Sequence, residues 1–230
     1  MNTSRWEEAN LRLRRNLRRR ERRINAFDIA RNKSILDYGC GDGLDLKIFK
    51  KLGYENIAGL DNSEDYVSRV GSEFKVYLAD ACNTGLPSHS FDVVFINGVL
   101  HHLNVYDALK EVKRILRVGG ELCIQEPGNS PAREMLDLLT FMVPFGYLRR
   151  RRIAAVEERD TYRGWLRLEP LFSSILQKFG FGVVFYRRLL ITIMVKCVSK
   201  DDIKCVDELD MSQLEPQTDS TSESIIKERC

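Results

Sequence analysis

The stretch ILDYGCGDG, residues 35–43, places a short apolar run directly before three closely spaced glycines. Glycines at the turn from a strand into a helix let a ligand approach the backbone closely and let the helix pack tightly on the strand. Aspartates accompany this turn at Asp37, Asp42 and Asp45. The stretch therefore predicts the first strand, a ligand-binding turn and the first helix of an α/β fold.

Outward from this turn, short β-rich runs alternate with stretches of helical length and pattern. The β-rich runs are 34–38, 56–60, 74–78, 91–97 and 121–125, and the helical stretches are 44–52, 63–71, 106–116 and 169–179. This alternation favours a parallel sheet with helices on its faces. Two last β-rich runs, 182–186 and 190–197, are separated by only three residues, and so short a connector forces an antiparallel pair. We therefore predict an α/β fold with one reversed strand.

The formal net charge of +3 hides two oppositely charged ends. Residues 1–33 carry 11 basic and 4 acidic side chains, whereas residues 199–230 carry 4 basic and 9 acidic ones. Apolar residues recur at near-helical spacing from Trp6 to about Arg31, so we expect the basic segment to be a helix. The tail 199–230 is expected to be disordered, because it has few apolar side chains to offset the entropy of ordering. Residues 34–198 between them form the folded domain.

The acidic character of the glycine turn indicates which cofactor it holds. A dinucleotide places a pyrophosphate over such a turn, and Asp37, Asp42 and Asp45 would repel it. The spacing is GxGxG here, whereas the dinucleotide pattern is GxGxxG. A cofactor with an ammonium and a sulfonium group is attracted instead. The electrostatics therefore favour S-adenosylmethionine over NAD, although Asp42 and Asp45 could equally cap the following helix.

Polar residues at the ends of the later strands extend this site, because open α/β sheets bind ligands at the carboxyl ends of their strands. Asp61 follows the second predicted strand, where a carboxylate can accept hydrogen bonds from ribose hydroxyls. Asp80 and Ala81 follow the third strand, where an adenine would be read. Asn97 ends the fourth strand and would face the methionine part of the cofactor.

Four stretches together resemble class I S-adenosylmethionine-dependent methyltransferases, of the group similar to the ubiquinone/menaquinone-type small-molecule enzymes. They are SILDYGCGDG (34–43), GLDNS (59–63), ADACNTGLPSHSFDVVFINGVLHHL (79–103) and LRVGGELCIQEP (116–127). The resemblance covers about residues 34–197. It implies a Rossmann-like seven-stranded, mostly parallel sheet with a reversed C-terminal strand and helices on both faces.

The resemblance also implies roles for individual residues. The cofactor-binding residues that it implies are Gly39, Cys40, Gly41, Asp61, Asn62, Asp80 and Ala81. Asp37 and Asn97, predicted above from their positions, complete the set. The three residues of the turn would contact the methionine part, and Asn62 would flank the adenine. Cys40 is expected to be a small packing residue, since methyl transfer needs no enzyme thiol. Val118 stands where the family usually has a proline, in a turn with a structural role.

His101 and His102 follow the fourth predicted strand, on the side where a methyl acceptor would sit. A histidine there can remove a proton from an acceptor hydroxyl or amine, because its pKa lies near neutral pH. Either histidine can equally be a helix-start residue satisfied by backbone or solvent. Transfer can also proceed without a base when the acceptor is held in line with the methyl–sulfur bond. His101 and His102 are thus the candidate catalytic residues.

Acceptor specificity is expected in an insertion or lid at 127–168. This insertion combines the apolar Leu138–Leu148 with four arginines at 149–152. Such a combination suits a hydrophobic substrate with an anionic head or docking on an anionic membrane surface, and it also fits a lid helix with a solvated basic end. The N-terminal arginines suit the phosphates of RNA. RNA is nevertheless the less favoured partner, because the arm lacks interleaved aromatic residues beyond Trp6. For this arm we prefer the interpretation that it is a helix covering the cofactor pocket.

These features predict a methyltransferase that acts on a small-molecule or lipid-like acceptor by in-line displacement. The alternatives are an RNA- or protein-directed methyltransferase docking through the basic arm, and a catalytically silent subunit, against which the intact turn with Asp61 and Asp80 speaks. No metal is expected. The six cysteines form no CxxC pair and no apolar stretch reaches the roughly 20 residues of a membrane span. We therefore expect reduced thiols and a cytoplasmic location, with peripheral contact to a membrane.

Overall fold

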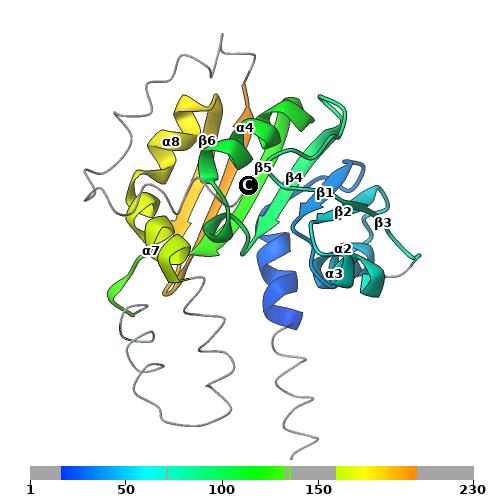
Figure 1. Ribbon diagram of the computed structural model, residues 1–230, viewed down its shortest axis with the longest axis horizontal. Coiled ribbons are helices and arrows are strands. Elements are labelled where there is room, and N and C mark those ends of the chain that lie inside the picture. Colours follow the sequence, from blue (N-terminus) through cyan, green and yellow to red (C-terminus); the bar gives the residue numbers. More distant parts are fainter. Residues whose placement is uncertain (1–16, 71, 133–134, 136–158, 201–230) are drawn as a thin grey trace, which may run out of the picture.

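A computed structural model describes residues 17–70, 72–132, 135 and 159–200. It contains one seven-stranded sheet in the order β3-β2-β1-β4-β5-β7-β6 (Figure 1). The strands are β1 (Ile35–Tyr38), β2 (Ile57–Asp61), β3 (Lys75–Leu78), β4 (Phe91–Asn97), β5 (Leu116–Pro127), β6 (Phe181–Arg188) and β7 (Thr192–Ser199). The helices are α2 (Leu44–Lys51), α3 (Glu64–Val70), α4 (Val105–Ile115), α7 (Arg159–Leu168) and α8 (Phe172–Lys178), with 3-10 turns η1 (Leu100–His102) and η2 (Glu169–Leu171). The start of the basic arm, most of the predicted insertion and the acidic tail lie outside the described residues.

The sheet is parallel except at β7, as the short connector predicts. β1 pairs in parallel with β2 and β4, β2 with β3, and β4 with β5. β7 runs antiparallel to both of its neighbours, β5 and β6. Residues 189–191 alone join β6 to β7, and a parallel return would need a crossover of a dozen or more residues. The predicted α/β class and the reversed strand are confirmed.

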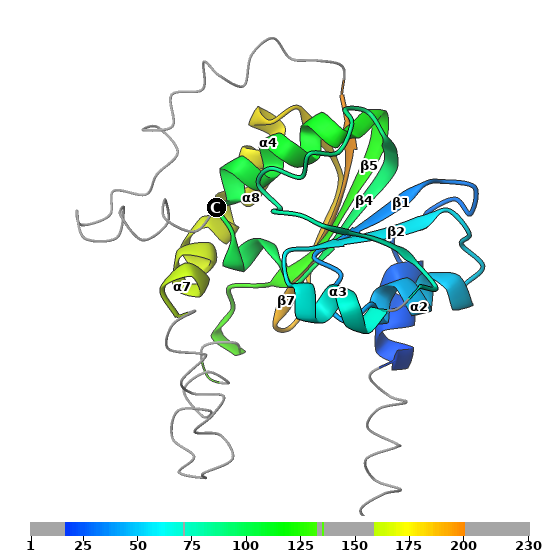
Figure 2. The same ribbon diagram turned by 45° about the vertical axis from the view of Figure 1, so that its right-hand side comes forward.

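Helices cover both faces of the sheet (Figure 2). Successive strand residues point to opposite faces, so Leu36 and Tyr38 lie in one core with α4 and α8, whereas Ile35 lies in a second core with α2. Helix α4 follows the helical period closely. Its buried apolar residues are Val105, Ala108, Leu109, Val112 and Ile115. This spacing turns one side of the helix toward the sheet.

The basic N-terminal helix ends earlier than the sequence pattern predicts. Its described part spans residues 17–25, and Asp28 then takes a φ of 49°, in the left-handed region that interrupts a helix. The prediction of a helix to about Arg31 is therefore wrong at its C-terminal end. Phe27 nevertheless stays fully buried, edge-on against the ring of Phe95 at 5.9 Å. The segment is thus anchored to the sheet by side chains beyond the helix.

Two further element boundaries differ from the predicted ones. β5 begins at Leu116, which pairs with Phe91, and a register shift precedes the pair Val93–Glu121. Gly119 lies within that shift with a φ of 73°. The predicted helix 169–179 is divided into η2 and α8. Pro170 lies at the start of η2, where a residue without an N–H cannot continue the bonding of α7.

Cysteine chemistry departs from expectation at one position. Cys40, Cys123 and Cys197 are buried free thiols. Cys82 is disulfide-bonded, so the expectation of a reduced thiol is wrong at this position, because the absence of a CxxC pair does not exclude a disulfide. Within the described ranges, no helix is both long and apolar enough to cross a membrane.

Candidate functional site

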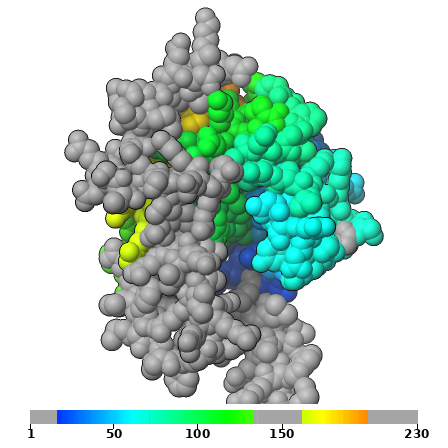
Figure 3. Space-filling model, viewed as in Figure 1, coloured from blue at the N-terminus to red at the C-terminus, as the bar shows by residue number. Residues whose placement is uncertain are grey.

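The predicted ligand site lies where the central strands end. Because β1, β2, β4 and β5 run parallel, their carboxyl ends meet at one edge of the sheet. That edge gathers the glycine turn after β1, Asp61 at the end of β2, Asn97 at the end of β4 and Gln125 near the end of β5. On the face shown in Figure 3, blue, cyan and green parts of the chain lie next to one another. Polar groups far apart in sequence are thus brought together.

The glycine turn is fixed to the sheet at one end and open at the other. The N–H groups of Gly39 and Cys40 both donate to the carbonyl of Leu60, at 2.7 and 2.9 Å. Gly39 has a φ of 80°, and an added Cβ would lie 2.5 Å from Cγ2 of Val99. At Gly41, with a φ of 52°, an added Cβ would meet nothing within 4 Å. The backbone at Gly41 is therefore open to close approach by a ligand.

Asp61 ties the end of β2 to this turn. Its Oδ2 accepts the N–H of Gly41 and its Oδ1 accepts the N–H of Ser63, both at 2.9 Å. Each carboxylate oxygen can accept one more hydrogen bond. Asp61 therefore has the acceptor capacity that ribose hydroxyls require, while it also holds the turn in shape.

Two buried carboxylates accompany the turn. Asp37 is 2% exposed and Asp45 is 5% exposed. Within the described part of the chain, Oδ2 of Asp37 and Oδ1 of Asp45 have no hydrogen-bond partner. Burial raises the pKa of Asp37 well above its usual range, Asp45 and Asp61 add to this rise, and Arg20 opposes it. Buried carboxylate oxygens without donors fit a cationic group and repel a pyrophosphate, so the residues present suit S-adenosylmethionine.

A polar chain crosses the site from the N-terminal helix to β5. Nη1 of Arg20 lies 2.8 Å from Oδ2 of Asp45, and the same oxygen accepts Nδ2 of Asn97 at 2.7 Å. Nε2 of Gln125 in turn donates to Oδ1 of Asn97 at 2.9 Å. Asp45 is thus engaged in this chain, and α2 is capped by Gly43 without a side-chain bond. Arg20 thus lies against the acidic turn, and the covering of a cofactor pocket by its helix stays a prediction.

We expect Asp37→Asn to stabilise the fold at neutral pH. Because its pKa is raised on folding, the native carboxyl favours the folded state most at low pH, below its ordinary pKa of about 4. That contribution is lost as the pH rises through the raised pKa. Urea denaturation from pH 4 to pH 8 should therefore show a gain of about 1–3 kcal/mol in the variant that grows with pH. A gain that is equal at every pH would contradict the buried charge, and Asp42→Asn, at an exposed position, should show none.

The residues predicted for adenine follow two neighbouring strands, with Asp80 and Ala81 after β3 and Asn62 after β2. Asp80 is exposed, and its Oδ1 accepts the N–H of Cys82 at 2.7 Å. Ala81 is buried, and its carbonyl accepts the hydroxyl of Tyr38. Asn62 is exposed. Their roles toward adenine stay predictions.

Cys40 packs inside the turn rather than facing a substrate. A Cβ at Gly59 would lie 2.7 Å from Sγ of Cys40, so the thiol fills the space that this glycine leaves. Burial, reinforced by the charges of Asp37 and Asp61, raises the pKa of Cys40 to about 12. The raised pKa disfavours the nucleophilic thiolate and agrees with a packing role for Cys40.

His101 and His102 lie in η1, next to a tyrosine of α7. The two imidazole rings are 3.9 Å apart, and the ring of Tyr162 stands edge-on to His101 at 5.8 Å. Nδ1 of His101 lies 2.7 Å from Oε2 of Glu126, a buried carboxylate near the end of β5. Helix α7 packs against η1, which carries both histidines. Proton-exchanging groups and aromatic rings therefore meet in one cluster beside the glycine turn.

Sequence reasoning missed Arg20, Glu126 and Tyr162. A signal for Glu126 exists, because it is an acid directly after the predicted strand 121–125, the same position that singles out Asp61. Arg20 is one of many arginines in its segment, and no pattern distinguishes the one that reaches Asp45. Tyr162 belongs to the insertion, whose packing no local pattern determines.

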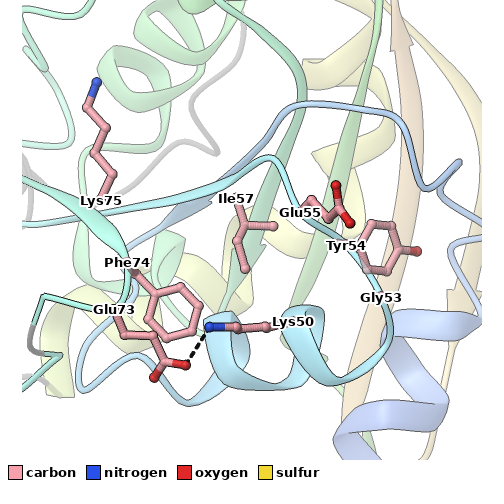
Figure 4. Close-up of a pocket in the computed structure, with 8 residues that line it drawn as sticks. All are labelled: Lys50, Gly53, Tyr54, Glu55, Ile57, Glu73, Phe74 and Lys75. Atoms are coloured by element: carbon pink, nitrogen blue, oxygen red, sulfur yellow. Dashed lines mark hydrogen bonds and ion pairs between the residues drawn. The ribbon is translucent and has the colours of Figure 1, made fainter.

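A separate hollow of about 410 Å³ lies at the opposite edge of the sheet, by the amino ends of β2 and β3 (Figure 4). Its lining residues are Lys50, Gly53, Tyr54, Glu55, Ile57, Glu73, Phe74 and Lys75. Nζ of Lys50 and Oε1 of Glu73 form an ion pair of 2.7 Å there. None of the predicted site residues lines this hollow, so the candidate site is at the carboxyl edge.

Comparison with known proteins bears on the family and the fold. Residues 36–124 match a family model described as a methyltransferase domain. The tRNA U34 carboxymethyltransferase of Shewanella frigidimarina is 34% identical over 110 residues, which are 44% of this chain and 33% of that protein. The enzyme of the same name from Vibrio cholerae is 31% identical over 104 residues, or 41% of this chain and 32% of that protein. The chain thus spans about a third of the length of these relatives.

Solved structures share the architecture at low sequence identity. An S-adenosylmethionine-dependent methyltransferase from Aquifex aeolicus superposes with a TM-score of 0.57 at 19% identity, over 78% of this chain and 89% of that one. The 1,6-didemethyltoxoflavin-N1-methyltransferase of Burkholderia thailandensis, with S-adenosylhomocysteine bound, gives a TM-score of 0.54 at 17% identity, over 80% and 78%. The predicted Rossmann-like methyltransferase fold is confirmed.

Proposed function

We propose that this chain, a class I S-adenosylmethionine-dependent methyltransferase, transfers a methyl group to a small-molecule or lipid-like acceptor by in-line displacement. The matched methyltransferase domain over residues 36–124 supports the family, the enzyme class and the methyl donor. The observation that carries the proposal is the pair of buried carboxylates, Asp37 and Asp45, whose unpaired oxygens accompany an open glycine turn. The acceptor class rests on the cluster around His101.

The donor fits residues at the ends of β1 and β2 and in the first turn of α2. The turn Gly39–Gly41 and the carboxylates of Asp37 and Asp45 would hold its methionine part, and Asp61 would accept its ribose hydroxyls. When bound, S-adenosylmethionine supplies an electrophilic methyl group on a sulfonium. The protein contributes by orienting the reacting atoms, which can lower the barrier by roughly 7–11 kcal/mol in favourable cases.

The acceptor side favours a small molecule with an apolar or planar part. The side chain of His101 is 14% exposed, and Trp165 of α7 is 2% exposed. Tyr162 stands edge-on to His101, so the described surface there is imidazole and aromatic ring. Such a surface binds apolar bodies and leaves a few polar groups to orient them. The insertion that would complete this side is mostly outside the described residues.

RNA is a second candidate acceptor, supported by the basic helix 17–25. Arg18, Arg19 and Arg22 are exposed, and among the described residues they have no acidic partner. Burial, together with the charges of Arg19 and Arg20, lowers the pKa of Arg23, which marks a crowded positive surface. Two relatives are named tRNA U34 carboxymethyltransferase, and this chain matches about a third of the length of each. Exposed arginines of this kind bind phosphates.

One labelling experiment tests the function and decides the acceptor. The protein is incubated with S-adenosylmethionine labelled on the methyl group and a cell extract, which is then separated into small-molecule, lipid, RNA and protein fractions. We expect label in the small-molecule or lipid fraction, and none with an Asp61→Ala control. Label in RNA that falls steeply with salt and with Arg18, Arg19 and Arg22 all changed to alanine would establish the second candidate. No label in any fraction would contradict methyl transfer.

A further inference from the structure

Resting on the proposed function, we propose that Glu126 is the positioning residue that fixes His101 with its proton on Nδ1, so that Nε2 of His101 accepts the proton of the methyl acceptor. His101 is then the catalytic base of the pair. His102, which the sequence makes an equal candidate, is a neighbour that packs on it at 3.9 Å between ring centroids.

Three donors hold the carboxylate of Glu126 in one orientation. Its Oε1 accepts the N–H groups of Val99 and Leu100, at 2.7 and 2.8 Å, and its Oε2 lies 2.7 Å from Nδ1 of His101. Glu126 is 1% exposed. Among the described residues, no lysine or arginine lies within ion-pair distance of it, and His101 alone does. A buried carboxylate with this set of partners is rigid and needs a donor at every contact.

The partner set decides which nitrogen of His101 carries the proton. An ionised carboxylate can only accept hydrogen bonds, so Nδ1 must be the donating nitrogen. In the described structure, Nε2 of His101 makes no hydrogen bond to another residue. In the neutral ring Nε2 therefore carries the lone pair, and this basic nitrogen has no hydrogen-bond partner among the described residues.

The pair lies directly beside the donor site. Val99 is the residue whose side chain lies against Gly39 of the glycine turn, and Glu126 binds the N–H of Val99. Gln125, the preceding residue of β5, ends the polar chain that starts at Arg20. Within the described ranges, the ionisable groups in contact with His101 are Glu126 from β5, His102 from η1 and Tyr162 from α7. The same backbone contacts that shape the donor site thus also orient the base.

In the proposed step, methyl transfer moves one proton and one positive charge onto His101. A lone pair of the acceptor oxygen or nitrogen forms the new bond to the methyl carbon, and the carbon–sulfur bond breaks with its electron pair left on sulfur. The acceptor proton moves to Nε2 of His101. The positive charge of the sulfonium ends on the imidazolium, which the carboxylate of Glu126 stabilises through Nδ1.

The decisive variant is Glu126→Gln. Its amide oxygen can keep both backbone N–H groups of Val99 and Leu100, so its NH₂ group faces Nδ1 of His101. Nδ1 must then accept, and the proton moves to Nε2. We expect ¹⁵N shifts of the histidine rings to show an unprotonated Nε2 in the native protein and a protonated Nε2 in the variant. Turnover should fall on the order of 10²–10⁴-fold, as the loss of a correctly oriented base predicts, with donor affinity unchanged.

Matched variants separate the roles. His101→Gln should lose turnover to the same extent and should not lose more when combined with Glu126→Gln, whereas His102→Gln should keep the native nitrogen shifts of His101. Native shifts in Glu126→Gln, or full turnover with shifted nitrogens, would overturn the proposal. The nitrogen shifts need no acceptor, so they report on the pair even if the labelling experiment finds no methyl transfer.

Discussion

Replacing Asp61 with alanine is expected to abolish measurable binding of S-adenosylmethionine. The carboxylate holds the N–H groups of Gly41 and Ser63, and its remaining acceptor capacity suits the ribose. Hydrogen bonds to a charged group contribute about 1.5–3 kcal/mol each, so losing two of them weakens binding by roughly 100-fold or more. Titration calorimetry measures the affinity directly.

Two controls sharpen this test. Asp65→Ala removes an exposed acid of α3 that pairs only with Arg69 in the described structure, and it should leave the affinity unchanged. Asp61→Asn keeps one acceptor oxygen and should fall between the native protein and Asp61→Ala. If Asp61→Ala binds the donor as tightly as the native protein, the assignment of Asp61 to the cofactor is wrong.

Trp165→Ala should cost about 3–5 kcal/mol of unfolding free energy, the range for truncating a buried aromatic residue. The indole is 2% exposed, stands edge-on to Phe172 at 4.9 Å and donates from Nε1 to the carbonyl of Pro127 at 2.7 Å. It thereby attaches α7 to the end of β5. The midpoint of urea denaturation gives the change, provided that the slope of the transition stays constant.

Trp165→Phe is the matched control, because it keeps an aromatic ring and removes the Nε1 donor. We expect a cost of about 1–3 kcal/mol, since the carbonyl of Pro127 loses its indole donor and part of the ring volume is missing. Equal losses in both variants would show that the hydrogen bond, rather than the ring, attaches α7. A loss below 1 kcal/mol in Trp165→Ala would contradict the buried position.

The order of elements in this fold is readable from the sequence for a physical reason. Buried parallel strands are short apolar runs, and the helices between them have a different period, so each change of period marks a boundary. The boundaries that failed depend on backbone geometry. The helix end near Asp28 requires a left-handed residue, and the early start of β5 requires a register shift around Gly119. Neither feature changes the spacing of apolar residues along the sequence.

The candidate site likewise has residues whose positions the sequence predicts and residues whose positions it does not. Asp61 and Asn97 were predictable, because a parallel sheet brings the ends of its strands to one edge whatever the packing around them. The partners of these residues were not. Arg20 reaches Asp45 across 25 positions in the sequence, and Glu126 reaches His101 across the same number. Such pairs depend on how whole elements pack, and charge patterning along the chain does not report that.

The polar chain from Arg20 to Gln125 has a consequence for protein engineering. The segment that matches the family model, 36–124, carries the glycine turn, Asp45 and Asn97, but both ends of that chain lie beyond it. A chimera that transplants only this segment would leave Asp45 buried without its counter-charge and Asn97 without its support. The shortest segment that can be transplanted with this polar chain intact therefore begins upstream of Arg20 and continues through β5.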